Sequence, residues 1–168
     1  MELIIKKEDI QLRIKQLASD ITSDYLKTGN SLAPVMICIL NGAYMFYTDL
    51  LRNMKIPVQS DFIRLKSYQG QDNSGGIDVI KGLEIDLKGR IVYIVDDICD
   101  TGTTILQALF MVNGHLPHQA KVVTLTRRRD GVDLTDFCGF IIGDEWISGY
   151  GLDHNGVGRN LEDLYKVN

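Results

Sequence analysis

Three aspartates and a turn of small residues form the part of this sequence best suited to chemistry. They lie in the stretch DDICDTGTT, residues 96–104, directly after the apolar run IVYIV. Carboxylates accept hydrogen bonds from sugar hydroxyls, coordinate Mg²⁺ or take up a proton, whereas backbone N–H groups and threonine hydroxyls bind phosphate oxygens. A phosphate attached to a ribose, with a metal ion nearby, would use all of these groups. The alternative is a buried strand that ends in solvated acids before a capped helix.

The residues on either side of this turn predict the elements that position it. Residues 91–95 are an unbroken apolar run rich in β-branched side chains, typical of a strand buried on both faces of a parallel sheet. After the turn, apolar residues recur at helical spacing: Ile105, Leu106, Ala108, Leu109 and Val112. The start of a helix offers unpaired N–H groups and partial positive charge to an anion, and Gly102 lets a ligand approach the backbone closely. We therefore expect a phosphate site at this turn.

The same layout of strand, turn and helix occurs earlier in the chain. The apolar run VMICIL at 35–40 is followed by the turn Asn41-Gly42-Ala43 and by helical periodicity over 44–54. An amphipathic helix is expected over 7–27. Further strands are expected at 58–65, 77–80, 121–126 and 137–142. This alternation predicts an α/β fold with a mostly parallel central sheet flanked by helices, and a cleft at the carboxyl ends of its strands.

Two glycine-rich segments are predicted to be irregular. The segment SYQGQDNSGG, residues 67–76, is polar and too long for a tight hairpin turn. It is either a flexible hairpin loop or a lid over a site. From residue 143 onward the frequent glycines favour a fitted loop region over a helix.

The composition is that of an ordinary globular protein. The chain has 168 residues, 45% of them apolar and 24% charged, which suits one domain with a sizeable core. A net charge of −4 without a basic face argues against a nucleic-acid partner, and no apolar run approaches the roughly 20 residues of a membrane span. Three cysteines without paired spacing favour reduced thiols and a cytoplasmic protein.

The stretch IVYIVDDICDTGTT resembles the motif with which type I phosphoribosyltransferases bind phosphoribosyl pyrophosphate (PRPP). From about residue 34 to the end, the chain is similar to the hypoxanthine-guanine branch of that family. The resemblance implies a single domain over 1–168, with a core at about 34–142 and a small hood from about 1–30 and 143–168. It implies a purine-salvage pentosyltransferase that uses Mg²⁺ and converts hypoxanthine or guanine plus PRPP into IMP or GMP and pyrophosphate. A homodimer or homotetramer is also implied.

The resemblance further implies a role for each site residue. The 5-phosphate would be bound by Asp100, Thr101, Gly102, Thr103 and Thr104, and the ribose hydroxyls by Asp96 and Asp97. Pyrophosphate would be bound by Asn41, Gly42, Ser67, Tyr68 and Arg159. The purine would contact Arg128, Trp146, Ile147 and Asp153. Mg²⁺ would be held by Asp153, Asp96 and Asp97. Asp100 matches the general base that takes the proton from purine N7.

Several of these residues also allow a structural interpretation. Asp100 could cap the helix, Trp146 could fill the core, Asp153 could cap a loop, and Arg159 could be a solvated surface residue. Two positions depart from the family pattern. Asn41 stands where Lys or Arg is usual, beside a peptide bond that can be cis in the family.

The second departure is Arg128, which stands where the family reads the purine 6-oxo group with Lys. An arginine still donates to a 6-oxo group and rejects the amino group of adenine, although its planar shape makes the exchange significant. Two rival functions remain. One is a PRPP- or nucleotide-sensing regulator on the same fold, and the other is a phosphoribosyltransferase for another base such as xanthine.

Overall fold

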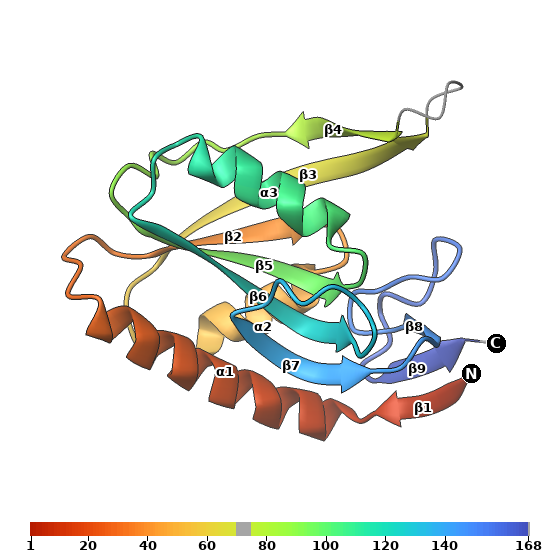
Figure 1. Ribbon diagram of the computed structural model, residues 1–168. Coiled ribbons are helices and arrows are strands. Elements are labelled where there is room, and N and C mark those ends of the chain that lie inside the picture. Colours follow the sequence, from red (N-terminus) through yellow and green to blue (C-terminus); the bar gives the residue numbers. More distant parts are fainter. Residues whose placement is uncertain (70–74, 168) are drawn as a thin grey trace.

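The computed structural model describes the backbone of residues 1–69 and 75–167, and the side chains of these residues except 66–69 and 75–77. Its elements follow one another along the chain as drawn in Figure 1. They are β1 (Glu2–Ile5), α1 (Lys7–Lys27), β2 (Val35–Leu40), α2 (Tyr44–Asn53), β3 (Gln59–Gln69), β4 (Gly75–Lys81), β5 (Ile91–Cys99), α3 (Thr103–Asn113), β6 (Gln119–Arg128), β7 (Phe137–Ile142), β8 (Trp146–Ser148) and β9 (Leu164–Val167).

The central sheet has six strands in the order β4-β3-β2-β5-β6-β7. All neighbouring pairs are parallel except β3 and β4, which are antiparallel. The predicted α/β fold with a mostly parallel sheet is therefore confirmed. The apolar runs of β2 and β5 lie in its middle, where a strand has neighbours on both edges and helices on both faces.

Helices cover the two faces of the sheet because the central strands send alternate side chains to opposite sides. Met36 and Cys38 of β2 pack in one core cluster with α1 and α2. Ile37 and Ile39 pack in a second cluster with Ala108 and other residues of α3. Helix α1 contributes a buried stripe at a spacing of three to four residues: Ile10, Ile14, Leu17 and Ile21.

A second, three-stranded sheet joins the two ends of the chain. Its order is β1-β9-β8, and both pairs are antiparallel. Figure 1 shows it beside the carboxyl ends of β5 and β6. The sheet lies within the segments expected to form the hood, although α1 of the first segment packs on the central sheet and the sequence predicted only irregular chain after residue 143. The strands β8 and β9 correct that expectation.

The ribbon of β3 and β4 is longer than the sequence predicts. Strand β3 continues through Ser67 and Tyr68 to Gln69, and β4 begins at Gly75. The loop expected over 67–76 is therefore wrong at both ends, and its middle, residues 70–74, lies outside the described residues. The side chains of Ser67 and Tyr68 also fall outside the described part.

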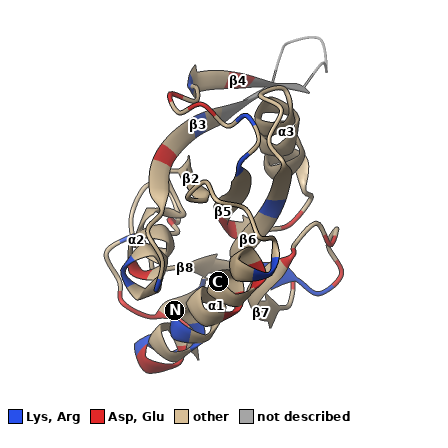
Figure 2. Ribbon diagram, turned by 90° about the vertical axis from the view of Figure 1, so that its left-hand side faces the viewer, with Lys and Arg blue, Asp and Glu red and all other residues tan. Residues whose placement is uncertain are grey.

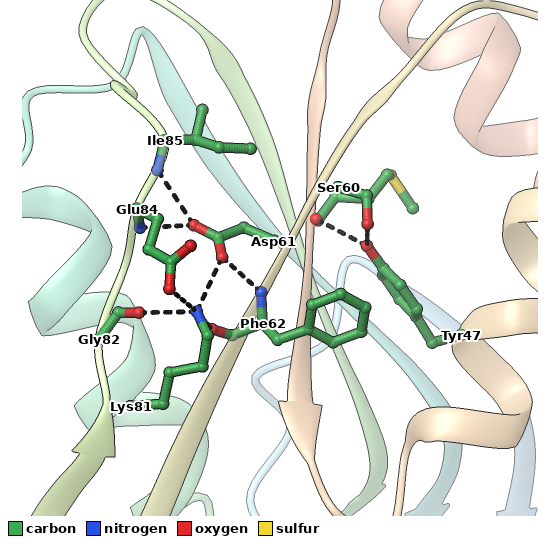
Figure 3. A network of polar contacts seen from close by, with 9 residues as sticks. Tyr47, Ser60, Asp61, Phe62, Lys81, Gly82, Glu84 and Ile85 are labelled. Carbon is green, nitrogen blue, oxygen red and sulfur yellow. Dashed lines mark hydrogen bonds and ion pairs between the residues drawn. The ribbon is translucent and has the colours of Figure 1, made fainter.

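A polar network fixes the base of this ribbon (Figure 3). The buried carboxylate of Asp61 on β3 accepts hydrogen bonds from Lys81 Nζ at 3.2 Å and from the N–H groups of Glu84 and Ile85 at 2.8 and 3.2 Å. Burial by itself would raise the pKa of Asp61, but these hydrogen bonds, together with one from the N–H of Phe62, lower it. The network thus ties β3, β4 and the following segment together at the end remote from the loop.

Charged residues of both signs are interspersed along the described part of the chain (Figure 2). Helix α1, the longest, carries acidic residues in its first turn and a lysine in its last, which complements the helix dipole. None of the helices in residues 1–69 and 75–167 combines the length and the apolar character that crossing a membrane requires.

Candidate active site

The carboxyl ends of β2 and β5 form the floor of a cleft. These strands are neighbours in the sheet, but α2, which follows β2, and α3, which follows β5, cover opposite faces. The connections therefore diverge at this point and leave a crevice, which is where open α/β sheets bind ligands. A hollow of about 280 Å³ lies there. It is lined by Ile39, Leu40, Asn41, Gly42, Leu65, Asp96, Asp97, Ile98, Asp100, Thr101, Gly102, Thr103, Thr104 and Ile105.

The turn between β5 and α3 forms one wall of this hollow. Gly102 is the N-cap of α3 and has a φ of +78°, which glycine adopts without a steric penalty. Thr101 and Thr103 are exposed, and their hydroxyls lie 3.0 Å apart. The N-cap Gly102 makes no side-chain hydrogen bond, and the N–H of Thr103 donates to the Thr101 hydroxyl only at 3.5 Å, so the start of the helix can still offer N–H groups to an anion. The alternative role of Asp100 as the helix cap is therefore wrong.

The two carboxylates at the end of β5 are in different environments. Asp96 is only 6% exposed, and burial raises its pKa well above the ordinary value, with the adjacent charge of Asp97 adding to the effect. Burial also raises the pKa of Asp97, while hydrogen bonds with Asp96 and with backbone N–H groups, and then the charge of Arg159 across the cleft, partly offset the rise. Negative charge on these two carboxyl groups is therefore unfavourable in the ligand-free protein. A ligand that brings hydroxyl donors or a cation would stabilise the charged form.

The turn after β2 presses directly against Asp97. The peptide bond between Leu40 and Asn41 is cis, as the resemblance implied. The Cα of Gly42 lies so close to the carboxylate of Asp97 that an added Cβ would overlap Oδ2. Glycine at this position therefore allows the two turns to share one wall of the cleft.

A second hollow, of about 150 Å³, adjoins the first. Asp97, Ile98 and Asp100 line both, so the hollows meet at the end of β5. The other lining residues of the second hollow come from the end of β6, from β8 and from the segment after it: Arg128, Trp146, Ile147, Leu152 and Asp153. Trp146 is 73% exposed, so the interpretation as core filler is wrong.

Arg128 is buried at the back of this second hollow. Its Nη1 donates hydrogen bonds to the carbonyl oxygens of Gly143 and Glu145, at 2.7 and 2.5 Å. Its Nε lies 3.6 Å from Oδ2 of Asp100. A guanidinium has five N–H donors in one plane, so these contacts fix the side chain and leave Nη2 for a ligand.

Asp153 and Arg159 form an ion pair on the opposite side of the cleft. Asp153 also accepts a hydrogen bond from the N–H of Gly156 at 2.8 Å, so it does cap its loop. Arg159 donates from Nη1 to the carbonyl of Gly151 at 2.6 Å. Its side chain is held by these contacts, which corrects the alternative of a freely solvated arginine.

The donor set of the cleft fits Mg²⁺ that arrives with a phosphorylated ligand. Among the residues that the structure describes, no group of three or more His, Cys, Asp and Glu side chains is arranged to hold a metal ion. Mg²⁺ is commonly bound through one or two carboxylates and completed by water and substrate phosphates. Asp96, Asp97 and Asp153 offer carboxylates of this kind around the two hollows.

The sequence-based predictions did not include all residues of the two hollows. Ile98 and Leu152 line the site but look like ordinary core residues in the sequence. Gly151 was also missed, although its Cα packs against the carbonyl of Gly42, where an added Cβ would overlap. The motif GYG at 149–151 was the available signal, because two glycines around one aromatic residue indicate an unusual backbone path.

Comparison with known proteins identifies the family to which this chain belongs. The phosphoribosyl transferase domain family matches residues 5–155. The hypoxanthine-guanine-xanthine phosphoribosyltransferase of Tritrichomonas foetus is 37% identical over 163 residues, which cover 95% of this chain and 87% of that protein. The hypoxanthine-guanine phosphoribosyltransferase of Aquifex aeolicus is 36% identical over 172 residues, covering 99% of this chain and 94% of that one.

Solved structures agree with these relatives. A hypoxanthine-guanine phosphoribosyltransferase from Bacillus anthracis superposes with a TM-score of 0.89 at 32% identity, covering 99% of this chain and 98% of the other. A hypoxanthine phosphoribosyltransferase from Staphylococcus aureus gives 0.90 at 30% identity, covering 100% and 91%. The chain therefore belongs to the phosphoribosyl transferase family and, within it, to the hypoxanthine-guanine phosphoribosyltransferases.

Proposed function

We propose that this protein transfers the 5-phosphoribosyl group from PRPP to hypoxanthine or guanine, giving IMP or GMP and pyrophosphate. The observation that carries the proposal is the meeting of the two hollows at the end of β5. One offers a helix N-terminus and hydroxyls to a phosphate, and the other offers Trp146 and a buried arginine to a flat base. The two acidic residues that line both hollows, Asp97 and Asp100, then lie where the sugar joins the base.

The sugar phosphate would be held by the turn between β5 and α3. The N–H groups and hydroxyls of residues 101–104 bind the 5-phosphate, and Asp100 begins this turn. Asp96 and Asp97 accept hydrogen bonds from the ribose hydroxyls. Because Asp96 is buried and Asp97 is partly buried, these bonds form in a medium of lower dielectric constant than water, where they are stronger.

The leaving pyrophosphate would lie between the turn after β2 and the segment that carries Arg159. Asn41 and Gly42 present backbone N–H groups, and Arg159 presents a guanidinium. Asn41 lacks the positive charge usual at its position, so the backbone contributes more of the binding here. Ser67 and Tyr68 would approach from the ribbon of β3 and β4. Mg²⁺, held by Asp153 and by Asp96 and Asp97, would supply positive charge to the developing anion.

The base would be activated by Asp100. As purine N9 forms its bond to the anomeric carbon, the bond from that carbon to pyrophosphate breaks, and the proton on N7 passes to the carboxylate of Asp100. Arg128 donates to the 6-oxo group, Trp146 stacks on the ring, and the backbone of Ile147 contacts the purine edge. An amino group at C6 would meet a donor where it needs an acceptor, so adenine is rejected.

The activity is tested with purified protein, Mg²⁺ and PRPP, mixed separately with hypoxanthine, guanine, xanthine and adenine. We expect nucleotide from hypoxanthine or guanine and none from adenine. Binding of PRPP without transfer to any of these bases would contradict the proposal and favour a sensing regulator. Nucleotide from xanthine alone would reassign the base specificity.

We further propose a cytoplasmic homo-oligomer. The free cysteines Cys38 and Cys99 are buried and suit a reducing compartment. Light scattering of the purified protein would give the mass of the assembly, for which we expect a dimer or tetramer. A monomer at micromolar concentration would contradict this part of the proposal.

A further inference from the structure

The segment after β8 has a left-handed backbone conformation, which residues other than glycine rarely adopt. Gly149, Tyr150 and Gly151 have φ values of +107°, +47° and +102°. For a residue with a bulky side chain such a conformation is unfavourable, and it persists only where surrounding contacts enforce it. Tyr150 is nevertheless only 5% exposed and packs within the core cluster. Its contacts must therefore supply the constraint.

The hydroxyl of Tyr150 supplies it through a bond to α2. The hydroxyl donates to Oδ2 of Asp49. Nε2 of Gln11 on α1 donates both to the same carboxylate oxygen, at 2.6 Å, and to the Tyr150 hydroxyl, at 3.1 Å. Three elements far apart in the sequence thus meet at one partly buried carboxylate. Burial, followed by the bond to Asp49, raises the pKa of Tyr150, so the hydroxyl stays protonated and remains a donor.

The path that this bond enforces brings Gly151 to the pyrophosphate side of the cleft. Gly151 packs against the carbonyl of Gly42 so closely that a Cβ would overlap it. The N–H of Gly151 donates to the carbonyl of Arg159 at 3.0 Å, and Nη1 of Arg159 donates to the carbonyl of Gly151 at 2.6 Å. Gly151 therefore positions both the backbone carbonyl and the guanidinium of Arg159 relative to the turn after β2.

The anchor and the turn belong to the same rigid unit. Helix α2 begins immediately after residues 41–43, and the N–H of Tyr44 bonds to the carbonyl of Asn41 at 3.3 Å. Asp49 lies on that helix, so any movement of the turn is shared by the carboxylate that holds Tyr150. The hydrogen bond between Tyr150 and Asp49 consequently joins two segments that lie 101 residues apart in the sequence and fixes the distance between them.

We propose that Tyr150 is a positioning residue for pyrophosphate binding, acting through its hydroxyl bond to Asp49, which fixes Gly151 and thereby Arg159 against the turn at Asn41 and Gly42. This inference rests on the proposed function, because it assigns pyrophosphate to that side of the cleft. Tyr150 itself does not line either hollow, so its effect on the ligand is indirect.

The test compares Tyr150→Phe with Tyr93→Phe. Tyr93 offers a matched control because its hydroxyl also donates to an aspartate, Oδ2 of Asp24, at 2.7 Å, and it joins β5 to α1 outside both hollows. We expect Tyr150→Phe to raise KM for PRPP, and KM for pyrophosphate in the reverse reaction, about fivefold or more, with KM for hypoxanthine within twofold of the control. Equal KM values for PRPP in the two variants would overturn the inference.

A second pair of variants separates positioning from general destabilisation. Asp49→Asn retains an acceptor for the Tyr150 hydroxyl, whereas Asp49→Ala does not. The alanine variant should show the raised KM and the asparagine variant should stay close to the unsubstituted protein; the reverse order would overturn the inference. Calorimetric titration with Mg²⁺ and pyrophosphate needs no turnover. If the protein transferred nothing but Tyr150→Phe still weakened pyrophosphate binding, the proposed function would fail while the positioning role stood.

Discussion

The side chains of Arg128 and Asp100 lie within 3.6 Å of each other, from Nε to Oδ2, between the two hollows of the cleft. Arg128 is buried with two backbone carbonyls as further partners, whereas the side chain of Asp100 is 54% exposed. The residue expected to recognise the base therefore contacts the residue expected to deprotonate it. One position of the purine would then place it both for recognition by Arg128 and for proton transfer to Asp100.

Asp100→Asn should slow turnover without weakening PRPP binding. The amide preserves the shape of the carboxylate but cannot accept the N7 proton, and general-base catalysis is worth about 10²–10⁴-fold in rate. We expect kcat to fall by that factor while KM for PRPP changes less than about threefold. Asp20→Asn, at an exposed position of α1, is the control. An unchanged kcat would remove Asp100 from the role of base.

Arg128→Met should weaken binding of the purine. Methionine fills much of the same volume but leaves the carbonyls of Gly143 and Glu145 without their donor, and the 6-oxo group without a partner. Loss of such polar contacts costs about 1–3 kcal/mol, so KM for hypoxanthine should rise by about tenfold or more, with KM for PRPP little affected. For Arg128→Lys, KM for hypoxanthine should lie between the values of the unsubstituted protein and of Arg128→Met.

The matched control for this substitution is Arg129→Met, at an exposed position beside it. If both variants bound hypoxanthine equally well in steady-state assays, Arg128 would have no part in reading the base.

Gly42→Ala should abolish most of the activity. The new Cβ would overlap the carboxylate of Asp97, so either the turn after β2 or the end of β5 must shift. A misplacement of about 1 Å in a catalytic site can cost on the order of 10²-fold in rate. At Gly82 an added Cβ meets nothing closer than 4.0 Å, so Gly82→Ala is the control. Similar kcat/KM values for the two variants would show that Asp97 does not need this contact.

Asp96→Asn should make the ligand-free protein more stable at neutral and alkaline pH. Burial, and then the charge of Asp97, raise the folded-state pKa of Asp96 above its unfolded value. The stability this group contributes is therefore fully present below the unfolded pKa and is lost as pH rises through the folded pKa. Asparagine carries no charge to desolvate, and its Oδ1 can still accept from the N–H of Asp97.

Melting temperatures of the two proteins between pH 4 and pH 8 measure this effect. The gain of Asp96→Asn over the unsubstituted protein should grow as pH rises, while transferase activity falls because a ribose contact is lost. If the gain in melting temperature stayed constant with pH, ionisation of Asp96 would not destabilise the folded protein, and its folded-state pKa would not be raised.

The elements with strong local patterns could be predicted from the sequence. The bounds of α1 and of β2 and β7 agree with the expectation, because a long amphipathic stripe or an unbroken apolar run marks them by itself. The turn between β5 and α3 could be predicted equally well, since its residues are contiguous from 96 to 104; its role in phosphate binding remains a prediction. The division into a core and a hood as one domain remains a prediction.

The remaining features depend on contacts between distant segments. The strands β1, β8 and β9 are only three or four residues long, too short for a periodic pattern, and they are strands because they pair with each other. Likewise, nothing local to Arg128 reveals that the carbonyls of Gly143 and Glu145 will hold it. Such features follow from tertiary structure, which overrides local preference.

The pairing of β8 with β9 has a consequence for the protein during its synthesis. A chain that has left the ribosome only as far as β8 already contains both turns of the phosphate half of the cleft, yet β8 still lacks the partner strand that keeps Trp146 and Ile147 in place. Capacity to hold the activated sugar can therefore arise before capacity to choose a nucleobase.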